Sequence, residues 1–155
     1  MFGKISIIGC GLIGSSILRA TQEKKLATKI SIYDKSNKVI EYLKKNFTAD
    51  ICSDVSETTK DADLTIISAP LSSYKEILLS IKSTLKEGSI LTDTGSAKKE
   101  VNKIVNDLSL KNISWIASHP IAGTEHSGPA AGFSSLFKNR SVSYTHLTLP
   151  TTVIV

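Results

Sequence analysis

The chain is predicted to fold as an α/β domain with a doubly wound, mainly parallel sheet. Two features of its sequence predict this class. Short runs rich in β-branched residues alternate with amphipathic segments of helical length, as in strands joined by crossover helices. The first of these runs breaks into G-x-G-x-x-G, from Gly9 to Gly14, and continues as a helical segment. The ligand crevice of such a sheet lies at the carboxyl ends of its strands.

The expected elements follow one another as far as residue 118. Strands are expected where aliphatic and β-branched residues cluster between turn residues: 4–9, 29–33, 49–52, 64–68, 89–92 and 114–118. Helices are expected in the mixed polar and apolar segments between these strands: 12–25, 36–46, 53–60, 73–85 and 97–108. This alternation favours parallel pairing of the strands.

The length and composition are typical of one soluble domain. The 155 residues are 41% hydrophobic and 21% charged, enough for a core of its own. No run of about 18 apolar residues occurs, and Met1 leads directly into the first strand, so we expect neither a membrane span nor a signal peptide. A cytoplasmic location is therefore expected.

Charge and cysteine content argue against two other classes of protein. The net charge is +5, but the lysines are dispersed and form no basic stripe interleaved with aromatic residues. Nucleic acid is therefore not an expected partner. Cys10 and Cys52 do not make a disulfide framework or a metal site, and no metal is expected.

Each glycine of the motif has a separate expected role. Gly9 allows a sharp turn off the strand, Gly11 allows the backbone to approach a pyrophosphate, and Gly14 allows close helix packing. The loop continues through Leu12 and Ile13 into the positive end of the helix, where N–H groups face the phosphates. These five residues form the phosphate-binding part of the expected dinucleotide site. A plain structural turn is the alternative interpretation.

Asp34 bears on which dinucleotide is bound. It ends the second expected strand, about twenty residues after the last glycine, where a Rossmann unit places the acid that binds the adenosine ribose. A carboxylate there repels the 2′-phosphate of NADP, so NAD is the expected cofactor. Lys35 and Lys38 could partly offset that repulsion, or could be solvated residues at the start of a helix.

Three further strand ends are candidate sites. Ser68, Ala69 and Pro70 end the fourth expected strand, where they are expected to contact the ribose and nicotinamide side of the cofactor. The other two ends carry D-T-G-S-A-K at 93–98 and S-H-P at 118–120.

The third strand end opens the block H-P-I-A-G-T-E-H-S-G at His119, and here the sequence resembles the prephenate/arogenate dehydrogenase family of tyrosine biosynthesis. The resemblance includes G-C-G-L-I-G-S at 9–15, Asp34, D-T-G-S-A-K at 93–98 and L-F-K-N-R at 136–140. The D-T-G-S-A-K block, the block that begins at His119 and the L-F-K-N-R block are together more specific than the glycines, because other nicotinamide enzymes share the first domain but differ after its fourth strand. A β-hydroxyacid dehydrogenase, an imine-type reductase and a non-catalytic nucleotide-sensing module are the alternatives.

The resemblance implies NAD-dependent oxidative decarboxylation of prephenate or arogenate. His119 matches the family's catalytic base, and histidine suits proton transfer near neutral pH. Ser96 matches a serine that hydrogen-bonds the same substrate hydroxyl and orients the histidine, although it could also be the N-cap of the following helix. Thr124 and Glu125 match residues that line the substrate entrance.

Three neighbouring residues are given lesser roles. Asp93 is expected to shape the turn after its strand, and Lys98 is expected to lie on the helix surface. His126 stands where the family often has lysine, and no role is assigned to it.

The resemblance ends at about residue 140. Residues 142–151 look like a translated transposase adapter from DNA sequencing, although ordinary strand propensity also describes this segment. The expected NAD-binding domain is therefore 1–140, with 141–155 an artefactual tail, and Tyr144 and His146 are left out of the functional argument. The family's helical second domain, which dimerises and binds a substrate carboxylate through an arginine, is absent. The complete protein is expected to be a homodimer, and this chain alone is expected to be inactive.

Overall fold

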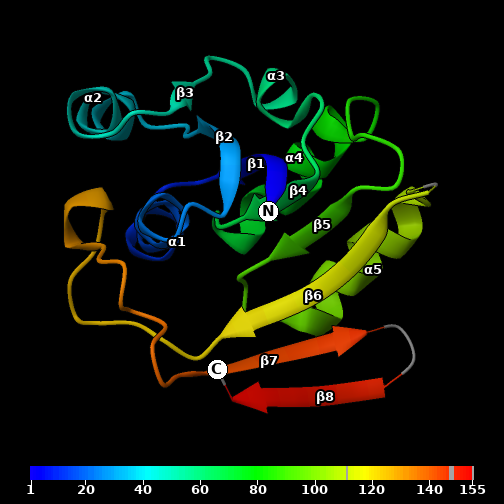
Figure 1. The fold of residues 1–155 in the computed structure, drawn as a ribbon. Coiled ribbons are helices and arrows are strands. Elements are labelled where there is room, and N and C mark those ends of the chain that lie inside the picture. Colours follow the sequence, from blue (N-terminus) through cyan, green and yellow to red (C-terminus); the bar gives the residue numbers. More distant parts are fainter. Residues whose placement is uncertain (111, 147–148, 155) are drawn as a thin grey trace.

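The computed structural model describes residues 1–110, 112–146 and 149–154, with side chains described as far as Tyr144. The strands within these ranges form one eight-stranded sheet in the order β3-β2-β1-β4-β5-β6-β7-β8 (Figure 1). Their bounds are β1 Phe2–Ile8, β2 Ala27–Tyr33, β3 Asp50–Ile51, β4 Leu64–Ile67, β5 Ile90–Asp93, β6 Ser114–Pro120, β7 Ser141–His146 and β8 Leu149–Ile154. The first six strands pair in parallel, whereas β7 and β8 are antiparallel. The order of the parallel strands is that of a Rossmann sheet, which confirms the predicted fold class.

Helices cover both faces of this sheet. Figure 1 shows α1 and α2 on one side of the strands and α4 and α5 on the other. The helical elements are α1 Leu12–Glu23, α2 Asn37–Asn46, α3 Val55–Thr59, α4 Tyr74–Ile81 and α5 Lys98–Leu108, with single 3-10 turns η1 Leu71–Ser73 and η2 Pro129–Ala131.

The alternation of side chains along β1 divides the core into two layers. Ile5 and Ile7 pack in one buried cluster with Leu18 of α1, whereas Ile8 packs in the other with Leu78 of α4. Successive strand residues point to opposite faces, so one strand supplies both clusters. Burial on both faces explains why the central strands are almost continuously apolar.

The predicted strands and helices are all present, with shifted ends. The helix predicted at 73–85 ends at Ile81, and the one predicted at 53–60 shortens to Val55–Thr59. Asp54 fixes the start of that short helix, because its carboxylate accepts the backbone N–H groups of the next turn. The two 3-10 turns escape prediction because a single turn leaves no periodic pattern.

The strand interpretation of the tail agrees with the fold. β7 and β8 form an antiparallel hairpin at the edge of the sheet, with Ser143 opposite His119. This pairing extends β6 as far as Pro120, two residues beyond the predicted end at 118. The domain boundary at 140 stays a prediction.

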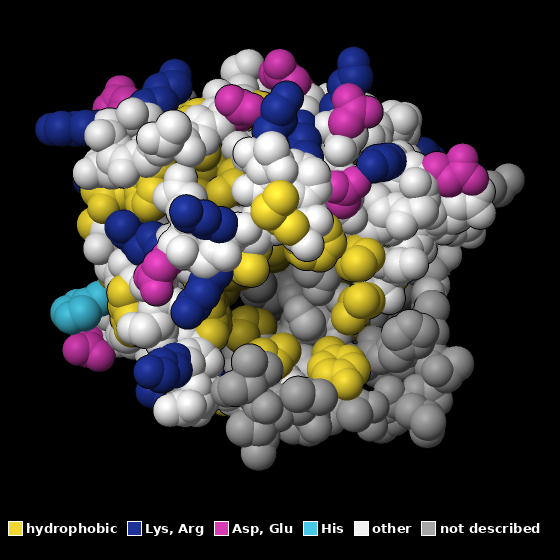
Figure 2. Space-filling model, in the orientation of Figure 1, with side chains coloured by type: hydrophobic (Ala, Val, Ile, Leu, Met, Phe, Trp, Pro, Cys, Tyr) yellow, Lys and Arg dark blue, Asp and Glu magenta, His cyan; other side chains and the backbone are white. Residues whose placement is uncertain are grey.

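The surface carries charges of both signs. Lys and Arg side chains are scattered among Asp and Glu over the face in Figure 2. Asp63 shows how such a charge can organise the fold, since its carboxylate accepts hydrogen bonds from the Gly3 N–H (2.7 Å) and from the Lys86 ammonium (2.5 Å).

Within the described residues, no helix combines the length and apolar character needed to cross a bilayer.

Two neighbouring leucines of α4 provide a test of the core. Leu78 is 0% exposed and Leu79 is 48% exposed. Leu78→Ala should lower the free energy of unfolding by about 2–5 kcal/mol, because it leaves a cavity between α4 and the sheet. Leu79→Ala, the matched control, should change it by no more than about 0.5 kcal/mol. Urea denaturation followed by circular dichroism measures both, and equal effects would contradict the placement of α4.

Candidate functional site

The carboxyl ends of five parallel strands form one row. Gly9, Ser68 and Thr94 each follow a strand and donate the backbone N–H to the neighbouring strand over 2.7–3.0 Å. The sheet ladder therefore continues one residue past β1, β4 and β5. Asp34 and His119 stand at the two ends of this row, Asp34 directly after β2 and His119 within β6. Parallel pairing thus brings together residues that are far apart in the sequence.

The glycine loop is tightly packed on one side and open on the other. Gly9 has φ +87°, and a Cβ at Gly14 would lie 2.1 Å from the Gly9 carbonyl oxygen. These two glycines are therefore required for the turn and for the close approach of α1 to β1. Gly11 is different, because a Cβ there would meet nothing within 4 Å. Space is thus left in front of the N-terminus of α1, where backbone N–H groups attract anions.

A hollow of about 460 Å³ occupies this space. The predicted cofactor residues that line it are Gly9, Gly11, Leu12, Ile13, Asp34, Ser68, Ala69 and Pro70. Gly14 is absent from the lining because it is buried behind the loop. Thr94 and Gly95 also line the hollow, and the sequence prediction did not assign them to the cofactor.

Asp34 connects the loop to the second strand. One carboxylate oxygen accepts the Cys10 N–H (2.7 Å) and the other accepts the Ser36 N–H (2.8 Å). Cys10 itself is 0% exposed, and burial followed by the charge of Asp34 raises the pKa of its thiol to about 12. The thiol stays protonated at neutral pH, so Cys10 packs in the loop as a small neutral side chain.

A second hollow of about 400 Å³ adjoins the first and shares Gly9, Asp34, Ala69 and Pro70 with it. The rest of its lining includes Val55 of α3, Ile77 of α4 and residues at the ends of β1 and β2. The two hollows meet at Asp34. Together they suit an extended ligand with one part on the glycine loop and another against apolar side chains.

His119 is held at the end of β6 by the neighbouring strand. Its Nδ1 lies 3.2 Å from the carbonyl oxygen of Thr94. A carbonyl oxygen only accepts hydrogen bonds, so this geometry assigns the proton of the neutral ring to Nδ1 and leaves Nε2 as an acceptor. His119 lines a small hollow of about 320 Å³ with Gly123 and Arg140 among others. Arg140 belongs to the L-F-K-N-R block, but the sequence assigned it no role.

The other predicted substrate residues are not gathered around His119. Ser96 is exposed, and its hydroxyl makes no hydrogen bond with the described residues. Its predicted alternative role as N-cap is wrong, because α5 begins one residue later with Ala97 at the N-cap. Thr124 and Glu125 are also exposed and do not line the hollow beside His119. Thr124 instead accepts the backbone N–H of His126 at 3.2 Å.

The expected surface position of Lys98 is also wrong. Its side chain is 19% exposed and its ammonium lies 2.5 Å from Asp93, which is completely buried. Asp93 does shape its turn as predicted, since its carboxylate accepts the Gly95 N–H at 3.0 Å. Helical periodicity could not reveal the lysine's partner, because the long side chain turns back past the N-terminus of α5.

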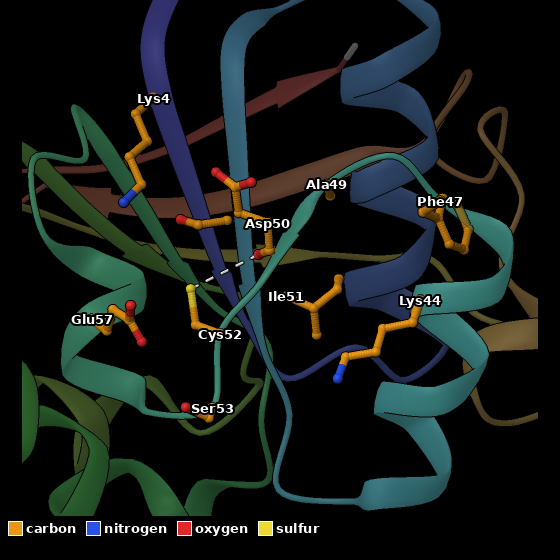
Figure 3. Close-up of a pocket in the computed structure, with 10 residues that line it drawn as sticks. Lys4, Lys44, Phe47, Ala49, Asp50, Ile51, Cys52, Ser53 and Glu57 are labelled. Atoms are coloured by element: carbon orange, nitrogen blue, oxygen red, sulfur yellow. Dashed lines mark hydrogen bonds between the residues drawn. The ribbon is translucent and has the colours of Figure 1, made fainter.

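A further hollow among the described residues shares no residue with these three. It measures about 720 Å³ and surrounds the edge strand β3. Figure 3 shows Lys4 and Glu57 on one side of this strand and Lys44 on the other. The Cys52 thiol contacts the Asp50 carbonyl oxygen at 3.9 Å. Charges of both signs are scattered around this open sheet edge. They do not converge on one point as the groups of an active site do.

Comparison with protein families agrees with this geometry. The family model described as "Prephenate dehydrogenase, nucleotide-binding domain" matches residues 17–150. The match begins after the glycine loop, so the assignment of that loop depends on its own geometry. The cyclohexadienyl dehydrogenase of Zymomonas mobilis subsp. mobilis is 38% identical over 146 residues, which are 94% of this chain and 50% of the relative. The prephenate dehydrogenase of Lactococcus lactis subsp. cremoris is 36% identical over 88% of this chain and 39% of its own.

Comparison with solved structures also finds prephenate dehydrogenases similar to this chain. The prephenate dehydrogenase of A. aeolicus, in complex with hydroxyphenyl propionate and NAD+, superposes with a TM-score of 0.82 and 25% identity over 96% of this chain and 52% of that one. A Streptomyces aurantiacus imine reductase shares only the fold, with a TM-score of 0.66 and 11% identity over 77% of this chain and 42% of that one. The chain spans half or less of the length of the curated relatives it matches. The match to the family model and the geometry of the strand ends agree. The chain belongs to the prephenate dehydrogenase family, as a nucleotide-binding domain.

Proposed function

We propose that this chain is the NAD-binding part of a dehydrogenase that oxidatively decarboxylates prephenate or arogenate for tyrosine biosynthesis. One observation carries the proposal. All the residues predicted to bind the cofactor except the buried Gly14 line one hollow, and Thr94 connects that hollow to the histidine predicted as base. The names of the Zymomonas and Lactococcus relatives support the reaction class.

The residues around the glycine loop fit a dinucleotide. The open space at Gly11 would admit the pyrophosphate, where the N-terminus of α1 offers N–H groups. Asp34 would hold the adenosine ribose, with the adenine in the adjoining apolar hollow beside Ile77. Ser68, Ala69 and Pro70 would contact the nicotinamide half. NAD would supply the hydride acceptor, and its presence in the A. aeolicus structure supports this choice.

His119 would act as the general base. Its Nε2 would take the proton from the C4 hydroxyl of the substrate as that carbon loses a hydride and the ring loses CO2. The Thr94 carbonyl supports this role because it leaves Nε2 free to accept. Ser96 is proposed to contact the same hydroxyl, and Thr124 and Glu125 to line the substrate entrance.

The remaining parts of the proposal concern the whole protein. The short span relative to the relatives supports a second domain, through which the protein would dimerise. We propose that residues 1–140 are the NAD-binding unit, that 141–155 lie outside it, and that the enzyme is cytoplasmic. The genomic reading frame after codon 140 tests this division. A frame that continues through residues 142–151 as printed would contradict it.

Two glycine substitutions separate binding from folding. Gly11→Ala should leave stability nearly unchanged but weaken NAD binding at least tenfold, because the new methyl group occupies the open space at the loop. Gly14→Ala should lower the free energy of unfolding by about 1–3 kcal/mol, because its Cβ would overlap the Gly9 carbonyl. NAD titration by calorimetry and urea denaturation distinguish the two. Unchanged NAD affinity in Gly11→Ala would refute the placement of the pyrophosphate.

Asp34→Ser should reduce the preference for NAD over NADP. The substitution removes both the ribose contact and the repulsion of a 2′-phosphate, so NAD binds more weakly and NADP more tightly. Dissociation constants of the chain for both dinucleotides measure this change. Lys38→Gln serves as the control for charge near the site and should keep the preference for NAD. If the unsubstituted chain bound both dinucleotides equally, the cofactor assignment would fail.

His119→Asn should lower kcat by about 10²–10⁴ in the protein that carries the complete second domain, the usual contribution of a positioned base. NAD affinity should stay the same, because the ring lies in the hollow beyond Thr94 rather than in that of the cofactor. His126→Asn is the matched control. Near-normal kcat in His119→Asn would mean that another group is the base.

A further inference from the structure

A closed network of hydrogen bonds lies directly beneath the end of β5. Asp93 is 0% exposed, and its carboxylate accepts the backbone N–H groups of Gly95 (3.0 Å) and Ser118 (3.2 Å) and the hydroxyl of Tyr74 (3.2 Å). Lys98 adds an ammonium 2.5 Å from both oxygens. A buried carboxylate is tolerated only when it is paired and hydrogen-bonded in this way.

Lys98 is the only cation among the described partners of Asp93. Burial lowers the pKa of its ammonium, and the hydrogen bond and charge of Asp93 oppose that shift. Its neighbour Lys99 has the same charge and lies in the same first turn of α5 but is exposed. The first turn of α5 therefore contains one lysine that faces the site and one that faces solvent.

The network connects to His119 through consecutive residues of two strands. Ser118, beside His119, gives its N–H to the Asp93 carboxylate and its hydroxyl to the Asp93 carbonyl oxygen (2.5 Å). Thr94, beside Asp93, presents its carbonyl to Nδ1 of His119. The carboxylate therefore fixes both backbone segments that determine where the imidazole lies and which nitrogen carries its proton.

We propose that Lys98 is a positioning residue for His119: its bond to Asp93 holds the Thr94 carbonyl in the place that keeps the proton on Nδ1 and Nε2 free. The catalytic meaning of this arrangement rests on the proposed function, because only a base needs a free Nε2. The position and tautomer of the ring do not depend on the proposed function. Lys98 itself has no direct contact with the hollow beside His119.

The tautomer of His119 can be measured in this chain without substrate or cofactor. Long-range ¹H–¹⁵N spectra of the imidazole distinguish a proton on Nδ1 from one on Nε2, and loss of the signal in His119→Asn assigns it among the three histidines. The unsubstituted chain should show the Nδ1–H form of the neutral ring. Lys98→Met should lose that form in favour of Nε2–H or a mixture. Lys99→Met, the matched control, should give the spectrum of the unsubstituted chain.

Two results would overturn the proposal. One is an Nε2–H tautomer of His119 in the unsubstituted chain, which needs no Lys98 variant and so holds even if Lys98→Met fails to fold. The other is a folded Lys98→Met whose His119 signals match those of Lys99→Met. Lys98→Arg keeps the charge and should preserve the Nδ1–H form. NAD titration of the unsubstituted chain tests the proposed function separately, because the tautomer is measured without cofactor.

Discussion

A helix begins so close to a strand end that no side chain fits between them. The Cβ of any residue but glycine at position 14 would lie 2.1 Å from the Gly9 carbonyl oxygen. This contact fixes α1 against the end of β1 and directs the N–H groups of its first turn into the open space beside Gly11. The neighbouring strands then supply Asp34, Ser68 and Thr94 around that space, because parallel pairing aligns their carboxyl ends. A close packing contact thus creates the site for an anionic ligand.

Two carboxylates at strand ends serve this arrangement in opposite ways. Asp34 accepts one backbone N–H on each oxygen and still borders both hollows of the crevice, so it keeps lone pairs for a ligand. Asp93 is enclosed by Lys98, Tyr74 and backbone donors, and burial together with its charge raises the pKa of the Tyr74 hydroxyl. The difference follows from strand position: β2 ends beside open space, whereas β5 ends beneath the packed start of α4 and α5. Asp34 can therefore bind a ligand, whereas Asp93 holds in place the backbone segments that position His119.

The sequence predicted correctly those elements whose structure depends on residues close together in the chain. β-branched runs located β1 and β4 because these strands are buried on both faces. The glycine spacing located the loop because its backbone geometry depends on glycine at positions 9 and 14. Helix ends were less certain, as at Ile81, because tertiary contacts decide where the last turn stops. The role of Ser96 as N-cap was wrong for the same reason: the chain enters α5 one residue later than its best capping residue.

By itself, the sequence determined the fold class, the glycine loop, the position of Asp34 and the strand end that carries His119. Each of these depends on residues close together in the chain or on a spacing that the Rossmann unit imposes. Only the tertiary structure decided that Lys98 turns inward to Asp93, that the Thr94 carbonyl holds His119, and that Arg140 borders the same hollow. These contacts join residues on different strands and helices. Their geometry depends on how the sheet aligns its strands, and no local pattern contains that information.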